Sequence, residues 1–113
     1  MVMTENFEIK VYFILGEEKH TFEVYFNNDK IVEVSKHYLA LEFVKELSFI
    51  EEDVLLNVYD ETYDISYSIL NGEIVSEFTV PYYMESYLGR YIETLNGNFK
   101  GDLILGYEET IST

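Results

Sequence analysis

Two neighbouring segments alternate apolar and polar residues so regularly that they leave little freedom in the fold of the first half. In residues 7–15, "FEIKVYFIL", every second side chain from Phe7 to Phe13 is apolar, and residues 20–26, "HTFEVYF", repeat the pattern. Successive side chains of a β-strand point to opposite faces, so this period predicts two half-buried strands. The intervening "GEEK" predicts that the strands form a hairpin.

The period changes after a second turn. The segment "NNDK" is rich in residues that tolerate turn conformations, and the following "IVEVS" predicts a short third strand. From there on, apolar residues fall at helical spacing, which predicts a helix over about 36–47 with Ser35 as its N-cap.

The second half resembles a looser copy of the first. "VLLNVYD", "TYDISYSIL" and "EIVSEFTV" predict strands, and Asn71 and Gly72 predict a tight hairpin between the last two. Pro81 is expected to open a second helix, which ends at Asn96 and Gly97. Its apolar stripe consists of Met84, Tyr87, Leu88, Tyr91, Ile92 and Leu95, of which Tyr87 and Tyr91 are expected in the core. A last strand is predicted around "DLILGYEE".

These elements predict a single α+β domain over residues 1–113. One strand-rich half would leave an apolar sheet face bare, so we expect a mostly antiparallel sheet of about six to seven strands with two helices packed on one face. Both halves run in the order strand, hairpin, strand, helix, an order that an internal duplication of a βββα unit would explain.

Composition excludes several classes of protein. The chain has no cysteine, which removes disulfides and thiolate chemistry, and neither a targeting signal nor a membrane span is expected in it. A net charge of −15 disfavours direct binding to nucleic acids or anionic membranes. We therefore expect a cytoplasmic protein whose partners are basic.

The negative charge is concentrated in the middle of the chain. Residues 46–89 contain ten acidic residues and no lysine or arginine, and the stretch 50–64, "IEEDVLLNVYDETYD", holds six of them. Surfaces that serve only solubility usually mix both signs, so this segregation favours a functional anionic face.

Metal binding and catalysis find little support in the sequence. The acidic stretch lacks the spacing and the glycine of a calcium loop, and His20 and His37 have no other zinc-type ligands nearby. We expect structural roles for both histidines, His20 at a strand start and His37 in the first turn of a helix. Because no motif for a nucleophile or a phosphate loop is present, we predict a protein that is not an enzyme and holds no metal or cofactor.

The leading hypothesis is a small binding protein that inhibits a partner by occupying its basic nucleic-acid-binding surface, as anti-restriction and anti-CRISPR inhibitors of phages do. The residues expected to bind the partner are acids on one continuous face, unpaired with cations, with tyrosines as aromatic anchors among them: Glu51, Glu52, Asp53, Asp60, Glu61, Asp64, Glu73, Glu77, Tyr59, Tyr63 and Tyr67.

Three alternatives stay open. An immunity protein or antitoxin would neutralise a cognate toxin by similar acidic complementarity. A small-molecule-binding or enzymatic domain would use a pocket between the sheet and the helices, with convergent polar groups in it. Self-association into a homodimer would use the sheet edges or the tyrosines.

Overall fold

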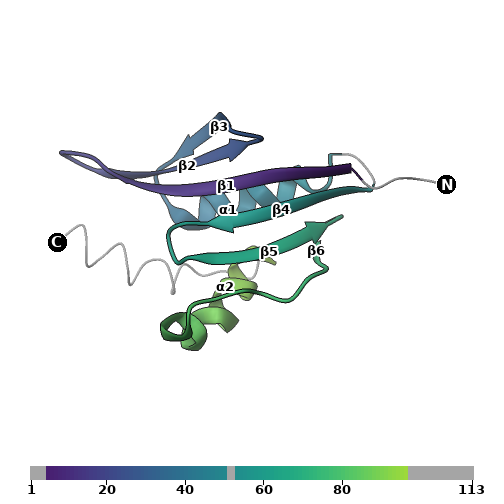
Figure 1. Cartoon of the computed structure of the whole chain (residues 1–113). Helices are drawn as coiled ribbons and strands as arrows, with labels where there is room; N and C mark the ends of the chain where they lie inside the picture. The colour runs from purple at the N-terminus through teal and green to yellow at the C-terminus, as the bar shows by residue number, and fades with distance from the viewer. Residues whose placement is uncertain (1–4, 51–52, 97–113) are drawn as a thin grey trace.

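The computed structural model describes residues 5–50 and 53–96 and has an α+β fold (Figure 1). Its elements follow in chain order: β1 (Glu5–Leu15), β2 (His20–Phe26), β3 (Asp29–Val34), α1 (His37–Leu47), β4 (Val54–Asp60), β5 (Ile65–Leu70), β6 (Glu73–Ile74), the 3-10 helix η1 (Tyr82–Tyr87) and α2 (Leu88–Leu95). The predictions of a mostly antiparallel sheet of about six strands with two helices, and of a helix over 36–47, are confirmed.

The sheet consists of two antiparallel meanders joined at their first strands. Its order is β3-β2-β1-β4-β5-β6, and among these described strands only β1 and β4 pair in parallel, with Ile9 beside Val58. A parallel pair needs a crossover connection, which α1 supplies as the chain passes from the β3 edge to the centre of the sheet. Alternation places side chains on faces but sets no strand order, so this parallel pair was not predictable from the sequence.

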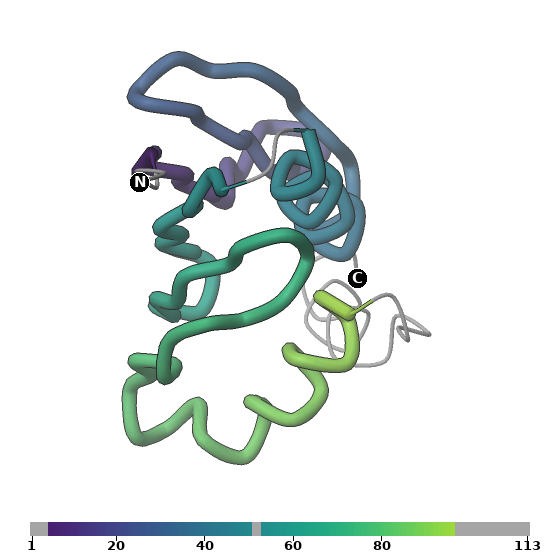
Figure 2. The backbone as a smooth tube through the Cα atoms, turned by 90° about the vertical axis from the view of Figure 1, so that its right-hand side faces the viewer, coloured from purple at the N-terminus to yellow at the C-terminus, as the bar shows by residue number. Residues whose placement is uncertain are grey.

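Both helices cover the same face of the sheet, as Figures 1 and 2 show together. The buried side chains of β1 and β2, such as Ile9 and Phe22, pack under α1. Tyr91 and Leu95 of α2 complete the core over β5, next to Ile65 and Ile69. The other face of the sheet is covered by neither helix and carries mostly polar side chains.

The C-terminal end of helix α1 is anchored to the turn between β5 and β6. The Ser48 hydroxyl donates to the Lys45 carbonyl (2.6 Å) and accepts the Gly72 backbone N–H (2.9 Å). The predicted Asn71-Gly72 turn is present, with positive φ at both residues (49° and 80°). At the other end of α1 the N-cap is Lys36, so the expected Ser35 cap is wrong.

The second predicted helix begins as a 3-10 helix. Pro81 precedes η1, and α-helical geometry starts only at Leu88. Because a 3-10 helix has about three residues per turn, the apolar residues of η1 do not stay on the side that faces the core. Tyr87 is therefore exposed, and its predicted core position is wrong. Tyr91, in the α-helical part, is fully buried as predicted.

The strand expected over "EIVSEFTV" is mostly irregular. The β5–β6 register would place Glu77 opposite Ser66, but Thr79 occupies that position, so two extra residues are accommodated. The Ser76 hydroxyl accepts the Ser68 backbone N–H at 2.7 Å and interrupts the regular ladder.

The last predicted strand, around "DLILGYEE", lies outside the described residues, and the proposed duplication stays a prediction. No helix within residues 5–50 and 53–96 is long and apolar enough to cross a membrane.

Candidate binding surface

Three residues expected at the partner surface are instead part of the core. Asp60 is fully buried, and Tyr63 and Tyr67 are almost so, at 7% and 4% exposure. Asp60 shares the face of Val54, Leu56 and Val58 on β4 because it continues their alternation. These three side chains are therefore buried in this structure rather than exposed to a partner.

The remaining acids of the expected face are divided between the two ends of the sheet. Asp53 precedes β4 and Glu73 begins β6 at one end, whereas Glu61 and Asp64 lie in the β4–β5 turn at the other. The seven residues of β4 separate these ends by roughly 20 Å. Glu77 lies between them, on the irregular edge segment 75–80 that follows β6. Glu51 and Glu52 lie outside the described residues. The described acids therefore do not form one continuous face.

The prediction that these acids lack cationic partners is consistent with the side chains that the structure describes. Within residues 5–50 and 53–96, the carboxylates of Asp53, Glu61, Asp64, Glu73 and Glu77 contact no lysine or arginine. Asp64 instead accepts a hydrogen bond from the hydroxyl of a tyrosine in β4.

Asp60 is the centre of a buried polar network. His37 Nε2 lies 2.6 Å from Asp60 Oδ2, and the Tyr91 hydroxyl donates to the same oxygen at 2.9 Å. The Tyr67 hydroxyl lies 3.4 Å from that of Tyr91, and the Thr62 backbone N–H donates to Asp60 Oδ1. Burial is the main reason why the pKa values of Tyr67 and Tyr91 are raised above 10.

This network holds β4, β5, α1 and α2 together rather than serving a substrate. His37, Asp60 and Tyr91 have no solvent exposure, so no substrate reaches them in this structure. Hydrogen bonds satisfy the buried carboxylate, which would otherwise be costly to desolvate. The predicted position of His37 in a helix first turn is confirmed, and its side chain is buried.

The uncovered face of the sheet, called the open face here, carries the accessible polar chemistry. Strand pairing aligns Tyr25, Lys10, Tyr59 and Ser66 in one row across four strands. A neighbouring row consists of Glu8, Asn57 and Ser68, and a third pairs Tyr12 with Glu23. Directly paired residues point to the same side of a sheet, so these side chains share one surface.

Carboxylates hold the tyrosines of the open face in place. The Tyr59 hydroxyl donates to Asp64 Oδ1 (3.0 Å) and that of Tyr25 donates to Glu23 Oε1 (2.9 Å), and these bonds raise the pKa of both tyrosines. The Tyr12 and Tyr25 rings stack edge to face, with centroids 5.2 Å apart. The open face thus presents ordered rings whose hydroxyls are already bonded to anions.

Tyr12, Tyr25, Glu8 and Glu23 were not among the predicted site residues. Alternation in β1 and β2 had placed them opposite the core, so the signal was present in the sequence. The prediction of site residues rests instead on the acid-rich middle segment.

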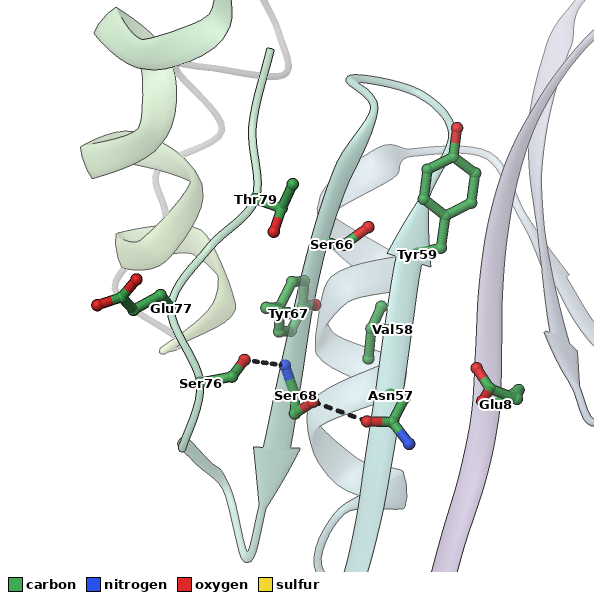
Figure 3. A pocket seen from close by; sticks show the side chains of 10 residues that line it. All are labelled: Glu8, Asn57, Val58, Tyr59, Ser66, Tyr67, Ser68, Ser76, Glu77 and Thr79. Carbon is green, nitrogen blue, oxygen red and sulfur yellow. Dashed lines mark hydrogen bonds between the residues drawn. The ribbon is translucent and has the colours of Figure 1, made fainter. Parts of the chain in front are cut away.

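A shallow groove of about 340 Å³ crosses the open face between β1 and the edge segment (Figure 3). Asn57 and Ser68 lie in it and are joined by a hydrogen bond from the Ser68 hydroxyl to Asn57 Oδ1 (2.8 Å). Figure 3 shows Tyr59 at one end, Glu8 on the β1 side, and Glu77 on the edge segment with its carboxylate turned outward. The other polar residues lining it are Ser66, Ser76 and Thr79.

The described residues that line the groove supply carboxylates, hydroxyls and an amide, and none of them is a lysine or arginine. Lys10 lies beside Tyr59 on the same face, and Lys30 contacts Glu23 (3.1 Å) and Glu33 (2.9 Å) farther away. The hydrogen bond from Lys30 is the main reason why the pKa of Glu23 is lowered. The groove is therefore an acceptor-rich site that suits a ligand with cationic hydrogen-bond donors.

No group of three histidine or acidic side chains that could hold a metal ion occurs among residues 5–50 and 53–96. The His37–Asp60 pair lies on the other side of the sheet, in the core.

Comparison of the chain with known protein families, curated proteins and solved structures gave no match.

Proposed function

We propose that the protein is a small acidic binding protein that recognises a basic partner protein through the open face. The observation that carries this proposal is the groove of Figure 3, whose described lining residues include Glu8, Tyr59 and three serines but no lysine or arginine, with Glu77 on its rim. An arginine or lysine of the partner would find there both charge and hydrogen-bond acceptors.

Recognition of the partner would combine long-range electrostatic attraction with short-range contacts in the groove. The net charge of −15 steers a basic partner toward the protein at long range, in a manner that weakens as salt increases. At short range, Glu8 and the serine hydroxyls accept hydrogen bonds from guanidinium or ammonium groups. The ring of Tyr59 offers a cation–π contact beside them.

A nucleic-acid-binding protein is the partner class we favour. The backbones of Glu8 and Glu77 are separated by β4 and β5, a distance of about 14 Å at the usual strand spacing. This distance is close to the width of about 12 Å of a DNA major groove, whose edges carry phosphates. Carboxylates carried on segments this far apart would meet basic side chains that otherwise contact the two DNA strands, which would make the protein an inhibitor of DNA binding.

Affinity capture from host lysate at low salt tests the proposal. Wild type is compared with Glu8→Gln/Glu77→Gln, and with Glu85→Gln/Glu93→Gln, a control that removes the same charge from exposed positions of η1 and α2. We expect wild type and the control to capture a nucleic-acid enzyme that added DNA displaces, and the open-face variant to lose it. Capture of a toxin that DNA does not displace would favour an immunity protein instead. Equal capture by all three proteins would refute the role of the open face.

A further inference from the structure

A second surface, on the helix-covered side of the sheet, has a different chemistry. A groove of about 400 Å³ lies between the C-terminal end of α1 and the sheet, where β1, β3 and β4 begin. The described residues that line it are all apolar: Phe7, Phe26, Ile31, Phe43, Leu47, Ile50, Val54 and Leu56. Two of these side chains face solvent, Ile50 with 71% and Ile31 with 40% exposure. Contiguous apolar surface of this kind marks a binding site more often than a solvated one.

The groove does not meet the expectation of an enzymatic pocket between sheet and helices, because its lining side chains include no acid, base or nucleophile. Its volume lies at the lower end of the range typical of ligand sites, and its apolar walls suit aliphatic or aromatic side chains.

The surroundings of the groove are anionic. Exposed Glu5 and Asp29 flank the strands that line it, and Asp53 is joined to Glu5 by a backbone hydrogen bond of 3.1 Å. Glu46 follows the groove residue Phe43 by three positions, close to one helical turn, and is exposed to solvent. An α-helix turns by about 100° per residue, so Lys45, two positions from both Phe43 and Leu47, lies on the side of α1 opposite to these groove residues.

The sheet edge beside the groove disfavours an extended occupant. Val24 pairs with Val32 and Tyr25 with Lys30, so Ile31 is an extra residue that forms a bulge in β3. Bulges and charged residues on an edge strand oppose the addition of another strand. A helix, which satisfies its own backbone hydrogen bonds, meets no such obstacle.

We infer that this groove binds a cationic amphipathic helix of a partner protein, with apolar side chains at positions i, i+3, i+4 and i+7 inserted between α1 and the sheet. Charge complementarity with Glu5, Asp29, Glu46 and Asp53 selects a basic partner. The same charges oppose a second copy of this chain, whose net charge is −15, and residues 97–113, which carry three acids and one lysine. This inference does not depend on the open face.

Binding of synthetic helical peptides to the full-length protein, measured by fluorescence anisotropy at physiological salt, tests the inference. The probe is a leucine–lysine peptide with leucines on one helical face. One control peptide has the same composition with scrambled positions, and another has glutamate in place of lysine. We expect the amphipathic leucine–lysine peptide to bind at least tenfold more tightly than either control and to gain helicity by circular dichroism.

Protein variants locate the site. Ile31→Lys/Ile50→Lys should weaken binding at least tenfold, whereas Leu15→Lys, a substitution of an equally exposed aliphatic residue (68%) outside the groove, should not. Glu8→Gln/Glu77→Gln should also retain binding, which separates this result from failure of the proposed function. Equal affinity for the scrambled or glutamate peptide, or unchanged affinity of the Ile31→Lys/Ile50→Lys variant, would overturn the inference. A wild-type dimer in light scattering that this variant dissociates would also overturn it, in favour of a second copy.

Discussion

His37 Nε2 lies 2.6 Å from Oδ2 of Asp60, and neither side chain has any exposure to solvent. This contact joins the first turn of α1 to the last residue of β4, and Tyr91 of α2 donates to the same carboxylate oxygen. A residue from the most acidic part of the sequence is thus a cross-link between the two halves of the core.

Replacing Asp60 with asparagine should destabilise the protein strongly. The substitution keeps the shape of the side chain but removes the charge that accepts hydrogen bonds from the buried network, and such losses cost about 2–4 kcal/mol. Urea unfolding followed by circular dichroism measures the effect.

Asp64→Asn is the matched control, because Asp64 is exposed and its carboxylate bonds only to the Tyr59 hydroxyl among the described residues. Its free energy of unfolding should stay within about 0.5 kcal/mol of wild type. Similar values for the two variants would show that the buried contact contributes little.

The buried tyrosines should make the protein sensitive to alkali. Burial raises the pKa of Tyr67 and Tyr91 above the value of about 10 that they have in the unfolded chain. The unfolded state therefore loses protons that the native state retains, so the stabilising contribution is complete below pH 9 and declines as pH rises above about 10.

Urea unfolding at several pH values, combined with tyrosinate absorbance, measures this decline. Tyr67→Phe and Tyr91→Phe should each make the alkaline loss of stability shallower. Tyr82→Phe, at an exposed position, should leave the slope unchanged. An identical slope in all three variants would contradict the assignment.

Two glycines should respond to alanine with opposite signs. Gly72 has φ of +80°, and a Cβ there would clash with the Phe49 ring, so Gly72→Ala is expected to cost about 1 kcal/mol or more. Gly89 lies in α2 with nothing near its Cβ position, and Gly89→Ala should stabilise by about 0.5–1 kcal/mol. Thermal melts of both variants give the comparison, and a stabilising Gly72→Ala would refute the account of the turn.

Much of the fold follows from residue periodicity, and so does part of what was missed. In "VLLNVYD", Asp60 has the same parity as Val54, Leu56 and Val58, and in "ISYSIL" Tyr67 has that of Ile65 and Ile69. The alternation therefore indicates burial of both side chains. Aspartate is usually exposed, and the prediction of Asp60 as a surface residue follows that tendency instead. A buried acid needs a partner from elsewhere in the chain, and the sequence does not show that His37 supplies it.

Other features depend on contacts that no local pattern encodes. The parallel pairing of β1 with β4 brings Glu8 beside Asn57 and Lys10 beside Tyr59, which creates the open face from segments about fifty residues apart. Similarly, the serine hydroxyl that bonds to the β5 backbone diverts the edge segment and places Glu77 at the rim of the groove. Strand order and such side-chain contacts are tertiary properties.

We propose that the position of the carboxylates, and not the net charge alone, determines the binding of basic partners. The affinity of an arginine-rich peptide, measured by calorimetry from 50 to 500 mM salt for wild type, Glu8→Gln/Glu77→Gln and Glu85→Gln/Glu93→Gln, tests this proposal. We expect salt-dependent binding in which the open-face variant is weaker than the control by about tenfold at each salt concentration. Equal affinities of the two variants, which carry the same net charge, would show that the position of the carboxylates does not matter.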